Sequence, residues 1–162
     1  GAREFHLAGY SMGGIVALVA ATKDKRISRL IAGGIGGGVV NLGKDPRVQN
    51  MGAIADGLMA ATSAAAEKLG PMASMFRTFA EGTGSDLMAL AAQARAGLRT
   101  PIALETITAK TLVLAGDTDM LASQPEKLAA AIPGAEVKVI AGDHMRVVGT
   151  AAFRSAIVQF FA

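Results

Sequence analysis

The amino-acid sequence predicts an α/β fold with about four parallel strands and flanking helices. Three observations point to this fold. Short apolar runs alternate with segments of helical periodicity at both ends of the chain, which is typical of βαβ units. Residues 111–115 form a continuous apolar run, as expected of a parallel strand that is buried on both faces. The 162 residues are 51% hydrophobic, which is enough for the packed core of one domain.

The first 45 residues are expected to supply two strands and one helix. Residues 4–8 are predicted to form a short buried strand, and residues 13–21 have the apolar spacing of a packed helix. A charged turn at 23–26 leads to a second strand at 27–32, which runs into a glycine-rich loop at 33–38. The order strand, helix, strand predicts that the first two strands are parallel.

The middle of the chain has a different pattern from the two ends. Residues 46–97 are rich in Ala and Met, with helical periodicity and no strand pattern, so we expect about three short helices there. Strands then resume, and the alternating polarity of the last one indicates an edge strand. The remaining elements are expected in the order strand, helix, strand and helix, at 111–115, 125–131, 136–140 and 153–161.

The turn between the first strand and the first helix reads Gly9-Tyr10-Ser11-Met12-Gly13. A strand, then Gly-x-Ser-x-Gly, then a helix is the context of a nucleophile elbow, whose strained turn lifts the serine hydroxyl clear of the sheet. Side chains at Gly9 and Gly13 are expected to collide with their neighbours. The Met12 N–H is expected to point at a bound carbonyl oxygen, near the positive end of the helix. In the alternative interpretation, Ser11 only N-caps the helix.

Two further segments follow predicted strands and carry polar side chains. Asp117 and Asp119 lie just past the strand at 111–115, where sites gather in parallel sheets. Either carboxylate could orient a histidine, and the alternative for each is a loop Asp that caps a turn. His144 follows the last strand, and its alternative is a solvated loop histidine. The chain order Ser, Asp, His is the order of the α/β-hydrolase triad.

Composition and charge exclude several other classes of protein. The net charge of +3 is spread over interspersed basic and acidic residues, without the basic stripe that nucleic-acid binding requires. The chain has no cysteine, and its two histidines lack metal-ligand spacing, so we expect no metal and no disulfide. His6 lies inside a predicted strand and is expected to be a hydrogen-bonded core residue. No apolar run approaches the roughly 20 residues of a membrane span, and no signal peptide precedes the first motif, so we expect a cytoplasmic protein with no membrane partner.

Residues 38–44 match the pattern G-x-x-x-x-G-K after a strand, which is typical of a phosphate-binding loop. Such a loop continues with Ser or Thr to hold magnesium, but here Asp45 and Pro46 follow. Because a carboxylate repels phosphate and has no hydroxyl to offer, we expect no nucleotide to bind there.

Three motifs together resemble the α/β-hydrolase superfamily, and most of all its small esterase-like and enol-lactonase-like members. The motifs are GYSMGG at 9–14, LVLAGDTD at 112–119 and GDH at 142–144. The resemblance implies a partial α/β-hydrolase fold with a helical cap-like insertion at 46–97. Segments 1–45 and 98–162 are then the hydrolase core, and the whole chain forms one domain.

The resemblance also implies a role for each site residue. Ser11 is the nucleophile, His144 is the base and Asp119 is the acid, which selects one of the two carboxylates. The Met12 N–H forms part of the oxyanion hole. The residues that flank the triad and are expected to line the substrate pocket are Tyr10, Met12 and Met145.

The chain departs from the family because it begins at the elbow strand. Family members carry about four strands before that strand, so we expect this sequence to be the carboxyl-terminal half of a hydrolase. The family's second oxyanion donor lies in the half that precedes the elbow, and losing one such donor costs about a hundred- to thousandfold in rate. The strand at 4–8 is expected to have an open edge. We therefore expect a homodimer through this edge or the apolar surface beside it.

Two functions of different classes follow from the residues and the resemblance. The first is a serine hydrolase that cleaves a small ester or acyl substrate through an acyl-enzyme, without a cofactor. The same triad also serves acyl transfer, carbon–carbon bond hydrolysis and cofactor-free peroxidation. The alternative is a catalytically weak or inactive fragment that acts as an oligomeric binding or structural module.

Overall fold

The computed structural model describes residues 1–42, 51–97 and 100–162, which belong to two compact units. The sheet unit comprises Gly1–Asn41 and Pro101–Ala162, and the helical unit comprises Leu42–Thr100. All strands of the described residues lie in the sheet unit.

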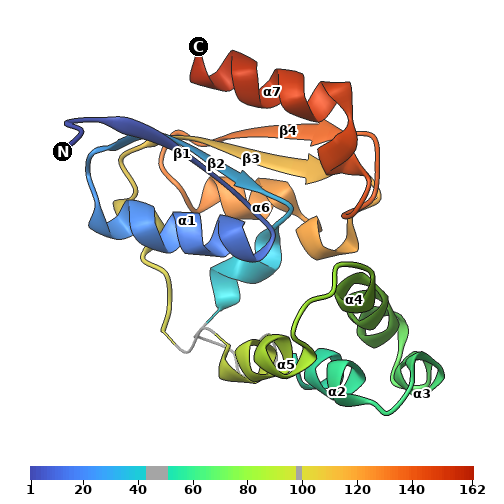
Figure 1. Cartoon of the computed structure of the whole chain (residues 1–162). Coiled ribbons are helices and arrows are strands. Elements are labelled where there is room, and N and C mark those ends of the chain that lie inside the picture. Colours follow the sequence, from blue (N-terminus) through green and yellow to red (C-terminus); the bar gives the residue numbers. More distant parts are fainter. Residues whose placement is uncertain (43–50, 98–99) are drawn as a thin grey trace. The chain divides into compact units, whose positions relative to one another are not determined.

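The sheet unit contains four parallel strands in the order β1-β2-β3-β4, which confirms the predicted fold class (Figure 1). β3 is buried along its whole length except at Lys110, as its apolar sequence predicts. Because the strands are parallel, their carboxyl ends meet at one edge of the sheet, where functional sites gather. The strands are β1 (Phe5–Tyr10), β2 (Ile27–Gly33), β3 (Lys110–Gly116) and β4 (Glu136–Ile140).

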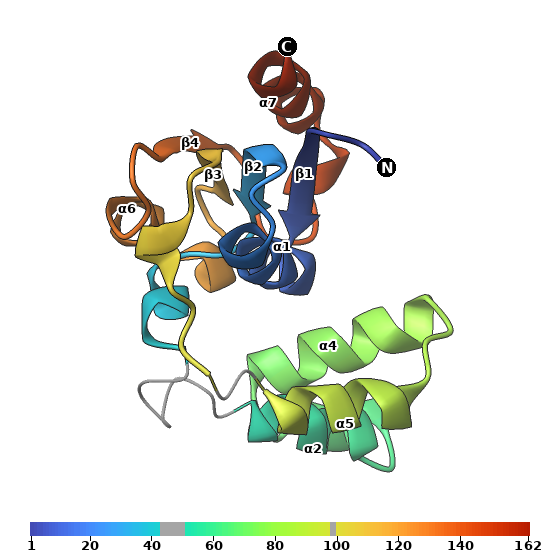
Figure 2. The ribbon, with the colours of Figure 1, turned by 90° about the vertical axis from the view of Figure 1, so that its left-hand side faces the viewer.

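Helices cover both faces of this sheet, as Figures 1 and 2 show. α1 (Met12–Lys23) packs against β1 and β2, and α6 (Pro125–Ala130) packs against β3 and β4 on the same face. α7 (Ala151–Phe161) covers the other face, where its apolar side packs on the sheet. The buried side chains of this second face are Ile31, Leu112, Leu114, Ile140, Val147, Phe153, Ala156 and Phe160. Short 3-10 helices occupy Gly37–Asn41, Leu104–Thr106, Met120–Ala122 and Val147–Gly149.

β1 lies at the edge of the described sheet, as predicted, but the prediction that its residues are buried is wrong. Among the described residues it pairs only with β2, and its side chains alternate between half-buried and exposed before Gly9. His6 is consequently exposed and not a core residue, although its Nδ1 lies 3.3 Å from the Ser28 hydroxyl and its ring stacks on Phe161. A homodimer through the open edge stays a prediction, which light scattering at micromolar concentration tests.

The helical unit contains four α-helices among its described residues, where about three were expected. The Thr62 and Asp86 side chains N-cap the second and fourth of these helices, and Pro71 opens the third. Apolar residues of three helices pack into a separate core around Ile54 and Leu58. The helices are α2 (Gly52–Met59), α3 (Ser63–Glu67), α4 (Pro71–Gly82) and α5 (Leu87–Ala96). Among the described residues, no helix of either unit has the length and apolar character needed to cross a membrane.

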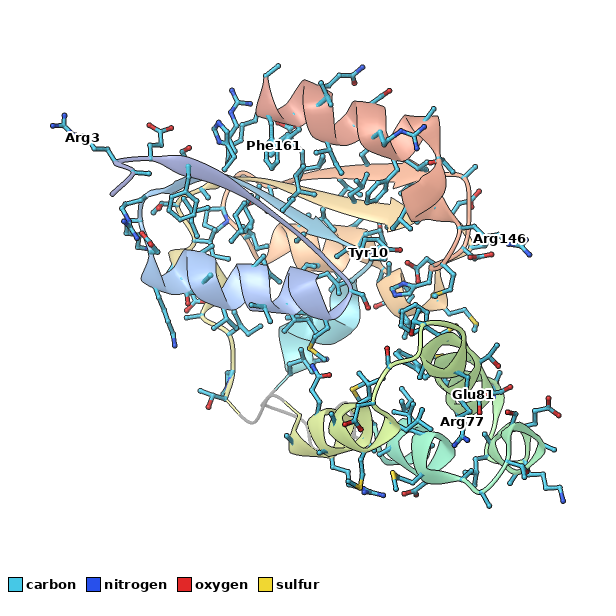
Figure 3. The ribbon with its side chains drawn as sticks, in the orientation of Figure 1. Arg3, Tyr10, Arg77, Glu81, Arg146 and Phe161 are labelled. Carbon is cyan, nitrogen blue, oxygen red and sulfur yellow. The ribbon has the colours of Figure 1, made fainter. Side chains whose placement is uncertain are left out.

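A buried arginine joins three helices of the helical unit. The Arg77 guanidinium donates hydrogen bonds to the carbonyl oxygens of Leu58 and Ala60, at 2.8 and 2.7 Å, at the end of α2. It also donates to Glu81, one turn further along α4 (Figure 3), and Glu81 accepts a second bond from the Ser63 hydroxyl of α3. The bonds from Arg77 and then Ser63 hold the pKa of Glu81 below its usual value. The stabilisation from this group is therefore present at neutral pH and lost as the pH falls through the lowered pKa.

We expect Arg77→Met to destabilise the helical unit by roughly 2 kcal/mol, because it leaves buried carbonyl oxygens at the end of α2 without their charged donor. Arg95→Met is the matched control, since Arg95 forms an exposed ion pair with Asp56, and exposed pairs contribute little. Hydrogen exchange of the amides in α2 and α4 measures both effects. Equal protection in the two variants would contradict the assigned role of Arg77.

Candidate active site

The turn after β1 has the strained backbone of a nucleophile elbow. Ser11 has φ 54° and ψ −120°, and it is one of two non-glycine residues with positive φ among the described residues. Ser11 occupies the N-cap position of α1, but its hydroxyl makes no capping bond to the helix, so side-chain capping does not account for a serine at this position. The Ser11 N–H donates to the Gly33 carbonyl oxygen at 2.8 Å, which ties the elbow to β2. The Ser11 carbonyl oxygen accepts from the N–H groups of Gly14 and Ile15, at 2.9 and 3.2 Å, so the backbone of the elbow is bonded to both β2 and α1.

The glycines of the elbow are not equally constrained. A Cβ at Gly9 would lie 2.0 Å from the Gly13 carbonyl oxygen, which is far inside contact distance. A Cβ at Gly13 would meet nothing within 4 Å, so the expectation of a collision at Gly13 is wrong for the described residues. The crowded position is Gly14, where a Cβ would lie 2.9 Å from the Gly33 carbonyl oxygen. Close contact of α1 with β1 and β2 therefore depends on Gly9 and Gly14.

Three of the predicted site residues form one hydrogen-bonded chain. Ser11 follows β1, Asp119 lies in the loop after β3, and His144 lies in the loop after β4. His144 Nε2 lies 3.0 Å from Ser11 Oγ, and His144 Nδ1 lies 2.8 Å from Asp119 Oδ2. Asp119 is 4% exposed and His144 is 8% exposed, whereas Ser11 is half-buried. The carboxyl ends of three strands thus bring together residues that are 133 and 25 positions apart in the sequence.

The hydrogen-bond partners fix the tautomer of the neutral imidazole. An ionised carboxylate only accepts hydrogen bonds, so Asp119 requires the proton of His144 on Nδ1. Nε2 is then the acceptor for the Ser11 hydroxyl. This arrangement lets the imidazole remove the hydroxyl proton, and the buried carboxylate beside it stabilises the imidazolium that forms.

The two candidate carboxylates have different positions. Asp119 Oδ1 accepts from the N–H groups of Leu121 and Ala122, which leaves Oδ2 for His144. Asp117 does not touch the imidazole, and its Oδ1 instead accepts from the Gly142 N–H at 2.8 Å. Asp119 therefore both caps a turn and contacts the imidazole of His144. Asp117 joins the loop after β3 to the loop that carries His144, a bracing role that no sequence pattern indicated.

The residues expected to line the pocket behave differently from one another. Met12 and Met145, which directly follow Ser11 and His144 in the sequence, are 38% and 42% exposed. The Tyr10 hydroxyl instead points inward and donates to the His144 carbonyl oxygen at 2.7 Å. Met120, which directly follows Asp119, is 71% exposed. Methionine thus directly follows each of Ser11, Asp119 and His144 in the sequence.

The backbone amides near Ser11 are placed to bind an anion. Met12 is the first residue of α1, where N–H groups have no partner within the helix. Within the described residues, no hydrogen-bond acceptor contacts the Met12 N–H.

The described residues contain no cluster of three or more acidic, His or Cys side chains that could hold a metal ion. The expected absence of nucleotide binding at 38–44 depends partly on residues 43 and 44, which lie outside the described residues.

Comparison with known proteins identifies the family. A model of the Alpha/beta hydrolase family matches residues 1–153. The crystal structure of a hydrolase from Pseudomonas aeruginosa PA01 is 28% identical and superposes with a TM-score of 0.70, covering 98% of this chain and 64% of that one. MenH from S. aureus is 26% identical with a TM-score of 0.72, covering 97% of this chain and 67% of that one.

An enol-lactonase from Burkholderia xenovorans LB400 is 22% identical, with a TM-score of 0.65 over 98% of this chain and 65% of that one, and shares the fold. The chain thus spans a little under two thirds of the length of the P. aeruginosa and B. xenovorans proteins. Curated protein sequences gave no match. The family match over residues 1–153, together with the four parallel strands and their flanking helices, shows that this chain belongs to the Alpha/beta hydrolase family.

Proposed function

We propose that the protein is a serine hydrolase that cleaves a small carboxylic ester or a related acyl substrate. The observation that carries the proposal is the continuous contact from Ser11 Oγ through His144 to Asp119, with distances of 3.0 and 2.8 Å. A hydroxyl bonded to an imidazole that a buried carboxylate orients is the arrangement of an activated nucleophile. Membership of the Alpha/beta hydrolase family supports the same reaction class.

In the first half of the proposed reaction, Ser11 Oγ attacks the ester carbonyl carbon while its proton moves to His144 Nε2. The carbonyl oxygen becomes an oxyanion, which the Met12 N–H stabilises at the amino end of α1. The tetrahedral intermediate collapses as the carbon–oxygen bond to the leaving group breaks. The imidazolium of His144 returns its proton to the departing alkoxide, so an alcohol leaves and an acyl-enzyme remains on Ser11.

In the second half, water replaces the alcohol and the same groups act in reverse order. His144 Nε2 removes a proton from water as the water oxygen attacks the acyl carbon. The bond to Ser11 Oγ then breaks, and His144 gives the proton back to the serine. The products are a carboxylic acid and the free hydroxyl of Ser11. His144 Nε2 carries the transferred proton in both halves of the reaction.

The side chains beside the three reacting groups favour an apolar acyl portion of short to medium length. Met12, Met120 and Met145 each follow a residue of the hydrogen-bonded chain and are exposed. Methionine is flexible and polarisable, so such side chains adapt to apolar groups of varied shape.

The experiment that tests this function compares Asp119→Asn with Asp117→Asn in the hydrolysis of short nitrophenyl esters. Asp119→Asn is expected to lower kcat by about 10⁴-fold, because an amide favours the wrong histidine tautomer. Asp117→Asn keeps an oxygen that can accept from the Gly142 N–H, so we expect less than about a fivefold change.

The result distinguishes three cases. Loss in the Asp119 variant alone supports the proposed hydrolase and the choice between the two carboxylates. Equal activity of the two variants would refute the role of Asp119. A folded wild-type chain that leaves every ester intact would refute hydrolysis by this chain and favour the alternative of a binding or structural module.

A further inference from the structure

Tyr10 connects the strand that carries the nucleophile to the loop that carries the base. It is the last residue of β1 and directly precedes Ser11 (Figure 3). Its hydroxyl donates to the His144 carbonyl oxygen at 2.7 Å and lies 3.5 Å from Asp119 Oδ2. Its ring centroid is 5.0 Å from that of His144, with the two planes tilted by 34°. One side chain thus contacts two members of the hydrogen-bonded chain and is covalently linked to the third.

The surrounding residues leave the Tyr10 ring little freedom. Phe153 of α7 packs edge-on against it, with ring centroids 5.6 Å apart. Gly34, which directly follows β2, has a φ of +64°. A Cβ at this position would lie 2.5 Å from Tyr10 Cζ. The ring therefore lies in a gap that requires glycine at position 34. Such packing holds the hydroxyl in one place, directed at the His144 main chain.

The Tyr10 hydroxyl is held in its protonated form, which can donate a hydrogen bond. Burial first, and then the charge of Asp119, raise the pKa of Tyr10 well above its usual value. The group therefore takes no part in proton transfer near neutral pH. Among the described residues, the Tyr10 hydroxyl is the hydrogen-bond partner of the His144 carbonyl oxygen. Other bonds in this loop hold its neighbours, since Asp143 accepts from the N–H groups of Met145 and Arg146.

We infer that Tyr10 is a positioning residue that keeps His144 Nε2 within reach of Ser11 Oγ. The inference rests on the proposed function only for its effect on rate. Two interactions of Tyr10 act together. The contact between the Tyr10 ring and the imidazole limits the tilt of the imidazole, and the hydrogen bond from the Tyr10 hydroxyl restrains the main chain of His144. Displacement of a catalytic group by about 1 Å can cost on the order of a hundredfold in rate. The side chain of the residue that directly precedes the nucleophile thus contributes to the alignment of the base.

The test is Tyr10→Phe, which keeps the aromatic ring and removes only the donor. We expect kcat for a nitrophenyl ester to fall about ten- to hundredfold while KM changes less than about twofold. Proton NMR of the imidazole gives a readout that is independent of turnover. The chain has two histidines, so a His6→Gln background leaves only the His144 signals. We expect the Nδ1–H signal of His144 to be sharp in the parent and to broaden or shift in Tyr10→Phe.

Each outcome decides for or against the inference. An unchanged kcat together with an unchanged His144 signal would overturn it, while the proposed hydrolase would stand. If the parent proves inactive on esters, the proposed function fails, and the NMR signal alone still decides whether Tyr10 positions His144. A rise in KM with an unchanged kcat and an unchanged signal would assign Tyr10 to substrate binding and also overturn the inference. Circular dichroism confirms that both proteins are folded.

Discussion

Replacing Ser11 by Ala is expected to lower ester hydrolysis by about 10⁴- to 10⁶-fold, because it removes the hydroxyl that would form the acyl-enzyme. The hydroxyl lies 3.0 Å from His144 Nε2 and makes no capping bond, so its loss removes the nucleophile with little effect on α1. Ser28→Ala is the matched control, since Ser28 lies on β2 and contacts His6. Steady-state rates with a nitrophenyl ester measure both variants, and retention of activity in Ser11→Ala would exclude Ser11 as the nucleophile.

A second substitution at Ser11 tests the backbone strain of the elbow separately from the loss of the nucleophile. At φ 54° and ψ −120° a residue with a Cβ is strained by on the order of 1–3 kcal/mol, and Ala keeps that strain. Ser11→Gly also removes the nucleophile, but it relieves the strain, partly offset by the greater freedom of glycine in the unfolded chain. We expect Ser11→Gly to be more stable than Ser11→Ala by about 1 kcal/mol in urea unfolding. A less stable glycine variant would contradict the assigned elbow geometry.

The second large effect concerns folding and not the reaction. Gly9→Ala is expected to cost more than about 4 kcal/mol, or to prevent folding, because its Cβ would lie 2.0 Å from the Gly13 carbonyl oxygen. That oxygen belongs to the backbone of α1 and cannot rotate away. The whole helix would have to move off β1, which would also displace the Met12 N–H. Urea unfolding of the purified variant, or its recovery in the soluble fraction, measures the effect.

Gly13→Ala provides the contrast, although both glycines belong to the same motif. A Cβ at Gly13 meets nothing within 4 Å, and Gly13 lies in the first turn of α1. Ala is favoured over Gly in helices by up to about 1 kcal/mol, so we expect equal or greater stability. A large loss of stability in Gly13→Ala, or none in Gly9→Ala, would show that the contact between α1 and β1 is wrongly assigned.

Much of the sheet unit could be predicted because local patterns determine its elements. The apolar run of β3 and the alternation of β4 identify both strands, and Gly-x-Ser-x-Gly between a strand and a helix identifies the elbow. Parallel strands then bring the residues at their carboxyl ends to one edge. This is why Ser11, His144 and one of the two carboxylates could be placed together from the sequence, whereas the choice of Asp119 over Asp117 came from the family resemblance.

The parts that were missed depend on contacts between distant residues. The open edge of β1 was expected, but the burial of its residues was not found, because the apolar sequence of a strand does not reveal how much of it other elements cover. The difference between Gly9 and Gly13 arises from which face of α1 approaches the strands. Nothing local to Tyr10 predicts that its hydroxyl meets a carbonyl oxygen 134 residues away. Bonds of this kind require the folded arrangement.

The central claim is that Ser11 is an activated nucleophile in this chain, and covalent labelling by a fluorophosphonate tests it most directly. The reagent phosphonylates a serine hydroxyl that a neighbouring imidazole deprotonates, and it leaves ordinary serines unmodified. Mass spectrometry of the digested protein then locates the adduct. We predict a single adduct on Ser11 that forms far more slowly in Asp119→Asn and is absent from Ser11→Ala. A folded wild-type chain with no adduct, or with its adduct on another residue, would contradict the claim.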